Sequence, residues 1–145
     1  MIPEDAMRAA IAIAQESLVT GDIPVGAVIL NPEGEIVATG KNEREALGDP
    51  TAHAEIVAIR SAANNGWRLD SHTLVVTLEP CAMCAGAIAQ SRIGNLIFGA
   101  WDEKAGAVGS VWDVLRDPRS IHTVEVRAGV LADECAQLLT DFFRE

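Results

Sequence analysis

Two short stretches decide how this chain folds: Thr51-Ala52-His53-Ala54-Glu55 and Pro80-Cys81-Ala82-Met83-Cys84. Together they offer one imidazole, two thiols and one carboxylate, and a nitrogen and sulfur donor set of this kind suits zinc. Three protein ligands, His53, Cys81 and Cys84, leave a fourth tetrahedral position for water, which is typical of a catalytic zinc site. Because Glu55 follows the histidine by two residues, we expect it to handle the protons of that water.

The spacing of the two cysteines indicates a helix that begins at the site. Cys81 and Cys84 are three residues apart, so they share one face of a helix. Pro80 suits the first helical position, because its missing N–H costs nothing there. Thiolates in the first turn of a helix are stabilised by unpaired N–H groups and by the macrodipole. Cap-type residues also precede His53, so the sequence predicts two helix N-termini that meet around one ion.

Each motif is ambiguous when it is taken alone. A single Cys-x-x-Cys is equally a redox pair, half of a structural zinc site or two core residues, and His-x-Glu is common on solvated helices. A structural zinc site needs a fourth protein ligand, and the remaining candidates, His72, His122 and Cys135, lack ligand spacing to one another. The two motifs in this order, with a strand-like segment between them, favour a catalytic zinc site. Cys135 is interpreted as a core residue.

The composition indicates one globular domain that spans residues 1–145. Hydrophobic residues make up 49% of the chain and charged residues 22%, as in ordinary soluble enzymes. The first residues lack the basic region of a secretory signal, so none is expected, and no apolar run reaches membrane-spanning length. Three cysteines do not make a disulfide framework, so a reducing, cytoplasmic location is expected.

Hydrophobic periodicity predicts the order of helices and strands. Helices are expected at residues 3–19, 52–64, 81–90 and 130–143. Strands are expected at residues 24–30, 35–39, 73–77, 95–100 and 123–127, with a polar, irregular loop at residues 40–50. The strand, helix and strand from residue 73 to residue 100 indicate a parallel crossover. The predicted fold class is α/β: a mixed five-stranded sheet with helices on both faces and an optional further helix before the last strand.

The order His-x-Glu followed by Pro-Cys-x-x-Cys is the signature of zinc-dependent nucleobase deaminases. The chain resembles the bacterial tRNA adenosine deaminase branch of the cytidine deaminase-like superfamily over nearly its whole length. The matching stretches lie at residues 24–28, 49–55, 76–87, 91–93, 98–104 and 131–135, and those at 91–93 and 99–104 point to the tRNA branch. The resemblance implies a three-layer α/β/α sandwich and hydrolytic deamination of adenosine to inosine at the anticodon wobble position.

The resemblance also implies how the work of the site is divided. One zinc ion per chain is held by His53, Cys81 and Cys84, and Glu55 moves the protons. The implied substrate-binding residues are Val25, Asn42, Ala54, Leu78, Asp102 and Lys104. The implied partners are the anticodon stem-loop of a tRNA and a second copy of the chain, with the apolar segment at residues 108–115 as a candidate dimer interface. No membrane partner is expected.

The charge of the chain weighs against RNA binding. The formal net charge is −10, from 11 basic and 21 acidic residues, whereas phosphate binding rests on Lys and Arg. Binding therefore requires a local basic patch, for which the candidates are Lys41, Arg44, Lys104, Arg116 and Arg119. Two alternatives stay open: a deaminase of a free nucleobase or nucleoside (guanine, adenine or cytosine), and a non-catalytic zinc-bearing subunit. The presence of Glu55 argues against the second alternative.

Overall fold

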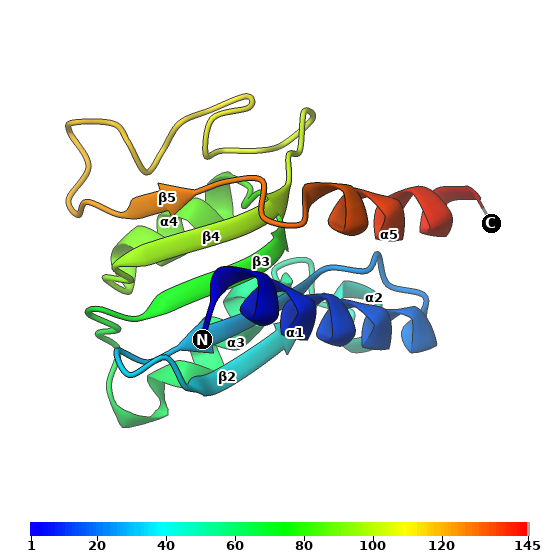
Figure 1. Cartoon of the computed structure of the whole chain (residues 1–145), viewed down its shortest axis with the longest axis horizontal. Helices are drawn as coiled ribbons and strands as arrows, with labels where there is room; N and C mark the ends of the chain where they lie inside the picture. The colour runs from blue at the N-terminus through cyan, green and yellow to red at the C-terminus, as the bar shows by residue number, and fades with distance from the viewer. Residues whose placement is uncertain (145) are drawn as a thin grey trace.

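Five strands form one mixed sheet in this computed structural model, which describes residues 1–144 and places Asn65 by its backbone alone (Figure 1). The strands are β1 (Gly26–Leu30), β2 (Ile36–Lys41), β3 (Thr73–Leu78), β4 (Asn95–Ala100) and β5 (Glu125–Arg127), in the order β2-β1-β3-β4-β5. β1 pairs antiparallel with β2 and with β3, whereas β3, β4 and β5 are parallel. The predicted mixed sheet and its parallel crossover are confirmed.

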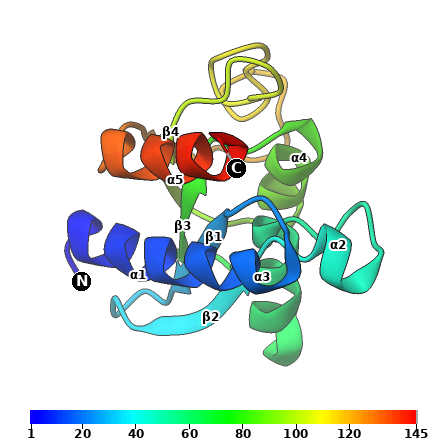
Figure 2. The same cartoon turned by 90° about the vertical axis from the view of Figure 1, so that its right-hand side faces the viewer.

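Helices cover both faces of this sheet. They are α1 (Pro3–Glu16), α2 (Arg44–Leu47), α3 (Ala54–Ala62), α4 (Ala82–Gln90) and α5 (Ala132–Arg144), with short 3₁₀ turns η1 (Ser17–Thr20) and η2 (Ala63–Asn65). Figure 2 shows α1 and α5 on one side of the strands and α3 and α4 on the other. The α/β class and the three-layer arrangement are therefore as predicted. None of the helices within residues 1–144 has the length and apolar character that a membrane crossing requires.

Alternate side chains of the central strands fill two separate cores. Along β1, Ala27 and Ile29 pack against the core that includes α3 and α4, whereas Val28 and Leu30 pack against the core that includes α1 and α5. Side chains on a strand alternate between its two faces. A strand that is covered on both faces is therefore apolar at every position, which explains the unbroken apolar run of β1.

Several element boundaries differ from those predicted by one to three residues, including the end of α1 and the start of α4. The first helix ends at Glu16 instead of residue 19, because the hydroxyl of Ser17 donates a hydrogen bond to the carbonyl oxygen of Asn42 at 3.0 Å and Gly21 closes η1 with a φ of 74°. The helix of the second motif begins at Ala82, with Cys81 as its N-cap. Pro80 therefore precedes the N-cap, and its predicted place at the first helical position was wrong by two residues.

Two connections also differ from those predicted. The irregular loop expected at residues 40–50 begins as the end of β2 and contains the one-turn helix α2. The optional helix before the last strand is not formed, because residues 101–124 run as turns and isolated bridges. Three residues of this stretch, Asp102, Val108 and Ser110, donate hydrogen bonds to the distant side chain of Glu79, which periodicity does not register.

Gly40 allows β2 and α3 to approach closely. A Cβ atom at this position would collide with the carbonyl oxygen of Ala54 and the amide nitrogen of Ala58. A glycine is the residue that permits such an approach of backbone to backbone. The contact seats the first turn of α3 against the end of β2, which places His53 at the edge of the sheet.

Candidate active site

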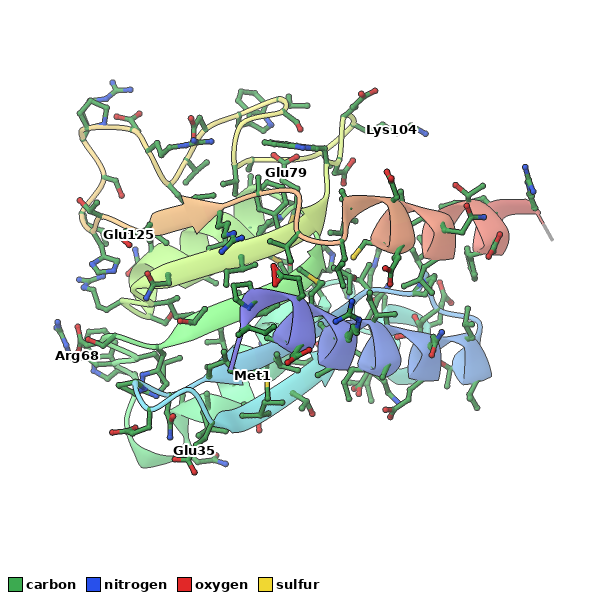
Figure 3. All side chains as sticks on the ribbon, viewed as in Figure 1. Met1, Glu35, Arg68, Glu79, Lys104 and Glu125 are labelled. Carbon is green, nitrogen blue, oxygen red and sulfur yellow. The ribbon has the colours of Figure 1, made fainter. Side chains whose placement is uncertain are left out.

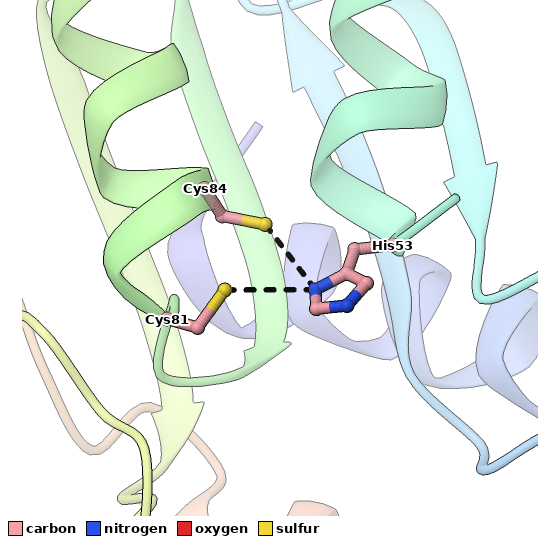
Figure 4. A group of neighbouring side chains, drawn as sticks. All are labelled: His53, Cys81 and Cys84. Atoms are coloured by element: carbon pink, nitrogen blue, oxygen red, sulfur yellow. Dashed lines mark hydrogen bonds between the residues drawn. The ribbon is translucent and has the colours of Figure 1, made fainter. Parts of the chain in front are cut away.

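The two predicted metal-binding motifs meet at the N-termini of α3 and α4. His53 is the N-cap of α3 and Cys81 is the N-cap of α4, and both have extended backbone conformations. Cys84 lies one turn into α4. Figure 4 shows both sulfur atoms facing Nδ1 of His53, at 3.6 Å from Cys81 and 3.5 Å from Cys84.

These distances fit a zinc ion. With Zn–S bonds of about 2.3 Å and Zn–N bonds of about 2.0–2.1 Å, tetrahedral geometry separates a nitrogen from a sulfur ligand by about 3.6 Å. The three donor atoms all lie within 4.8 Å of one another, and no other such group of His, Cys and acidic side chains occurs in residues 1–144. His72, His122 and Cys135 lie outside the group, so the donor set is the three-ligand type that leaves one position open.

The two thiols of the site influence each other's ionisation. The hydrogen bond that Cys84 donates lowers the pKa of Cys81 to about 4, and the same bond raises the pKa of Cys84 far above its ordinary value. The hydrogen bond with Cys81 also raises the pKa of His53. One thiolate is thus favoured by the protein, whereas a cation between the sulfurs is what stabilises the second thiolate.

Glu55 lies in the first turn of α3, where it lines the same cavity as His53 and Cys81. It is 4% exposed. Burial raises the pKa of its carboxyl to about 7, and the charge of His53 opposes the rise. A carboxyl whose pKa lies near neutrality accepts and donates a proton with similar ease, which is the property required of a proton shuttle.

The cavity beside these groups has a volume of about 220 Å³. Pockets that enclose drug-sized ligands have volumes of roughly 300–1,000 Å³, so this cavity suits a single planar base. Five residues of the substrate-binding set line it: Val25, Asn42, Ala54, Leu78 and Asp102. The sixth, Lys104, is exposed and projects from the loop after Asp102, outside the lining (Figure 3).

Four further residues line the cavity outside the predicted set: Ile23, Arg44, Glu79 and Ala105. The sequence suggested Arg44 as part of a basic patch and of a loop that is a plausible place for substrate contacts. Glu79 is 2% exposed, and four hydrogen bonds offset its burial so that the pKa of its carboxyl is below the ordinary value. The sequence signal for Glu79 was an acidic residue between an apolar strand and the cysteine motif, because acidic side chains are rarely buried without partners.

Asn42 is held in one orientation by the backbone. Its Nδ2 donates to the carbonyl oxygen of Ile23 at 3.1 Å, and its Oδ1 accepts from the amide of Arg44 at 3.2 Å. The residue is 7% exposed. An amide side chain carries two donors and two acceptor positions, so each of these atoms retains one further hydrogen-bonding position.

Residues 2–100 match the family model of the cytidine and deoxycytidylate deaminase zinc-binding region. The chain belongs to this family of zinc-binding deaminases. Within it, the chain is 49% identical over 144 residues to the tRNA-specific adenosine deaminase of Haemophilus influenzae. The aligned region covers 98% of this chain and 83% of the relative. The zinc dependence and the deaminase class predicted from the two motifs are therefore confirmed.

Two solved structures resemble the chain over almost its whole length. One, from work on A-to-I editing by tRNA:A34 deaminases at the wobble position of transfer RNA, has a TM-score of 0.89 and 39% identity, and covers 93% of this chain and 99% of that chain. The other is the guanine deaminase of Bacillus subtilis, with a TM-score of 0.68 and 31% identity, covering 99% of this chain and 94% of that chain. The tRNA-editing structure is the more similar of the two.

Proposed function

We propose that this chain deaminates adenosine to inosine at the wobble position of a tRNA anticodon. The observation that carries the proposal is the buried carboxyl of Glu55 beside the His53, Cys81 and Cys84 donor set, in a cavity of one-base size. The substrate follows from the similarity to the Haemophilus influenzae tRNA-specific adenosine deaminase. The reaction consumes one water and releases ammonia.

Each residue of the site has a proposed task in this reaction. His53, Cys81 and Cys84 hold the zinc ion, which supplies, when bound, the Lewis acidity that makes water a nucleophile at neutral pH. Glu55 takes the proton that the attacking water loses and delivers it to the ring nitrogen next to the carbon under attack. The same carboxylate then takes the second proton of that water, from the oxygen now bonded to the carbon, and delivers it to the departing amine, so that one side chain serves as base and acid in turn.

The remaining wall residues are proposed to recognise the base. Val25 and Leu78 offer apolar surface to its faces, and the backbone of Ala54 offers hydrogen bonds at its edge. Asn42 uses its remaining donor and acceptor on the nucleoside. Asp102 and Lys104, on the loop that follows β4, are proposed to contact the neighbouring nucleotides of the anticodon loop; their support is the similarity of this stretch to the tRNA branch.

The cationic groups available to an RNA are few. Arg116 and Arg119 of the candidate patch are each paired with an aspartate, at 3.2 Å and 2.8 Å. Among residues 1–144, Lys41, Arg44 and Lys104 form no ion pair. Arg44 lines the cavity, so these three side chains are the proposed basic rim. Binding of a structured RNA loop needs only a local basic rim and a pocket for one base.

A second candidate function is deamination of a free nucleobase, which the net charge of −10 favours. The purified protein is incubated with an anticodon stem-loop that carries adenosine at the wobble position, and separately with free adenine, guanine and cytosine. We expect mass spectrometry to detect inosine in the RNA, with a rate that falls steeply as salt rises. Turnover of a free base that does not depend on salt, with the RNA unchanged, would establish the second candidate. Turnover of neither, with zinc bound, would indicate a non-catalytic subunit.

A homodimer is proposed from the resemblance and from exposed apolar surface. Val108 and Leu115, at the ends of the candidate interface, are buried in the core of this chain, whereas Val111 and Trp112 are 46% and 61% exposed.

Sedimentation is expected to give twice the 15.4 kDa of one chain. Trp112→Glu should weaken the dimer, and Trp67→Glu, which changes another exposed tryptophan, should not. A mass of one chain for the unmodified protein at micromolar concentration contradicts the proposal.

The proposed domain organisation is a single deaminase domain over residues 1–145, of which the structure describes 1–144. One sheet that carries both cores supports this organisation. A cytoplasmic location is proposed as well. Its support is the pair of thiols used as metal ligands, which a reducing compartment preserves.

A further inference from the structure

Glu79 is a buried carboxylate that forms no ion pair with the residues that the structure describes. It lies between the end of β3 and the cysteine motif, and it is 2% exposed. A charge that is removed from water without an opposite charge is strongly destabilising unless hydrogen bonds replace its hydration. The role of Glu79 therefore depends on which groups supply those hydrogen bonds.

One loop supplies all of them. Oε1 accepts hydrogen bonds from the amide of Asp102 at 3.0 Å and from the hydroxyl of Ser110. Oε2 accepts from the amides of Val108 and Ser110, at 2.9 Å and 3.1 Å. The donors lie 23 to 31 residues after Glu79 in the sequence. Figure 3 labels Glu79 beside this loop and shows Lys104 projecting from it.

The same loop is fastened to the segment that carries the first cysteine. Gly106 forms an isolated β-bridge with Cys81, and the amide of Ala107 donates to the carbonyl oxygen of Pro80 at 2.8 Å. A Cβ atom on Gly106 would collide with the carboxylate of Glu79 and with the carbonyl oxygen of Asp102. The loop is thus wrapped tightly around the carboxylate, with a glycine at the point of closest approach.

We propose that Glu79 is a positioning residue that locks the loop at 102–110 onto the cysteine segment. Asp102 and Ala105 of this loop line the cavity. The hydrogen bonds to Glu79 therefore fix the position of a loop that forms part of the wall for the substrate. Glu79 acts through the loop and takes no part in the proton transfers. The substrate in question rests on the proposed function, whereas the ordering of the loop does not.

Asp22 provides a comparison at another part of the cavity lining. It is 1% exposed, and it accepts hydrogen bonds from the amides of Glu45 and Ala46 at 2.6 Å and 3.2 Å. These amides belong to α2, whose Arg44 lines the cavity. Glu79 and Asp22 are therefore two buried carboxylates of the same kind, each bound to a different wall of one cavity.

Substitutions separate the charge from the shape of the side chain. In Glu79→Gln an amide replaces one oxygen, and because an NH₂ group cannot accept, at least one backbone N–H of the loop loses its partner. In Ser110→Ala the hydroxyl is lost but the backbone amides still bind the carboxylate. In Asp22→Asn the lost acceptor affects α2 and the hydroxyl of Thr20, which donates to Asp22 at 2.6 Å, but not the loop at 102–110. The expected disorder of the loop is greatest in Glu79→Gln, smaller in Ser110→Ala and absent in Asp22→Asn.

Limited digestion of the zinc-loaded protein with trypsin, followed by mass spectrometry, tests the proposal without any substrate. Cleavage after Lys104 reports on the loop and cleavage after Arg44 reports on α2. Glu79→Gln should accelerate cleavage after Lys104 about tenfold, because an unpartnered buried donor shifts the local opening equilibrium by about that factor. Cleavage after Arg44 should stay unchanged, and Asp22→Asn should give the reverse pattern. Ser110→Ala should accelerate cleavage after Lys104 by roughly threefold.

Kinetics on the anticodon stem-loop supply a second readout. Glu79→Gln should raise KM about tenfold and leave kcat within about threefold, because the wall binds the substrate and does not move protons. Equal acceleration of cleavage after Lys104 and after Arg44, in Glu79→Gln and in Ser110→Ala, would make Glu79 a residue of general stability and overturn the proposal. Unchanged cleavage after Lys104 would overturn it as well. A fall in kcat alone would do the same. If the chain proves inactive on RNA, the digestion pattern still decides the role of Glu79.

Discussion

The cavity has a floor and a rim, which are built in different ways. The floor consists of His53, Glu55, Cys81 and Cys84, and it lies on the first turns of α3 and α4. His53 and Glu55 are two positions apart in the sequence, and Cys81 and Cys84 are three positions apart. Helix geometry places Cys81 and Cys84 on one side of the start of α4, His53 and Glu55 are near neighbours at the start of α3, and the sheet brings the two helix ends together.

The rim consists of residues 42–48 and 102–110, which are held from a distance. Asp22 binds the first segment and Glu79 binds the second, through hydrogen bonds that span 23 to 31 residues. The floor therefore holds its geometry through local spacing, whereas the rim does so only when the whole fold is formed. The comparison teaches that the chemistry and the substrate contacts of this enzyme can be changed separately.

Removal of both cysteines should have the largest effect, because it removes two of three ligands from the floor. The Cys81→Ala, Cys84→Ala double variant is expected to lose bound zinc and essentially all turnover. Metal analysis and the inosine assay measure the two losses. Cys135→Ala serves as the control, because this buried thiol lies outside the donor set. Full zinc content in the double variant would refute the proposed ligands.

Replacing the carboxyl of Glu55 should break the chemistry while the floor stays in place. Glu55→Gln is expected to keep the zinc and the fold and to lose about 10²–10⁴-fold in kcat, the usual contribution of general acid–base catalysis. Glu103→Gln, which changes an exposed carboxyl on the rim, is the matched control. A Glu55→Gln enzyme that stays within about tenfold of the parent is incompatible with a proton shuttle at this position.

Charge reversal on the rim should affect binding and not chemistry. Changing Lys41 and Lys104 to Glu is expected to lower kcat/KM on the stem-loop at least about tenfold at moderate salt. The slope of log affinity against log salt should become shallower by about 2, one unit for each lost phosphate contact. Arg8→Glu removes a cation from α1, on the other face of the sheet, and should leave both quantities unchanged. An unaltered slope in the Lys variant would place RNA elsewhere on the surface.

The smallest effect is expected at Gly86, on the helix that carries the floor cysteines. A Cβ atom there meets nothing within 4 Å, and glycine inside a helix costs about 0.5–1 kcal/mol relative to alanine. Gly86→Ala should therefore raise the free energy of unfolding by about that amount, which urea titration measures. Tryptic cleavage after Lys104 should not change, since the rim is held from elsewhere. A destabilised Gly86→Ala protein would show that another surface, such as a second copy, packs on this face.

The elements of the sheet were predictable because their signals are local. The apolar runs at residues 26–30 and 95–100 indicate strands that are covered on both faces, because alternate side chains then pack into two cores. The boundary errors at Pro80 and at the end of α1 arose from contacts that the local pattern does not contain. Ser17, for example, bonds to the backbone of a residue 25 positions later.

The candidate site divides in the same way. The donor set was predictable from two motifs, because each motif places its ligands on one helix end. Five of the six proposed substrate residues line the cavity, but that set came from a resemblance and not from the spacing. Arg44 was predicted only as part of a basic patch and of a loop for substrate contacts, and Glu79 as the buried anchor was not predicted. Nothing in the local sequence of Glu79 indicates that Ser110 lies beside it.

The amino-acid sequence by itself determined the zinc donor set, the carboxyl beside it and the α/β order of the strands and helices. Those features depend on residues that are near neighbours in the chain, and their spacing is set by the geometry of a helix turn or a strand. The tertiary structure alone decided which loops enclose the cavity, and that the buried carboxylates of Asp22 and Glu79 accept hydrogen bonds from their backbone. A buried charge finds its hydrogen bonds only when distant backbone segments are brought together, so the local sequence does not indicate which groups donate them.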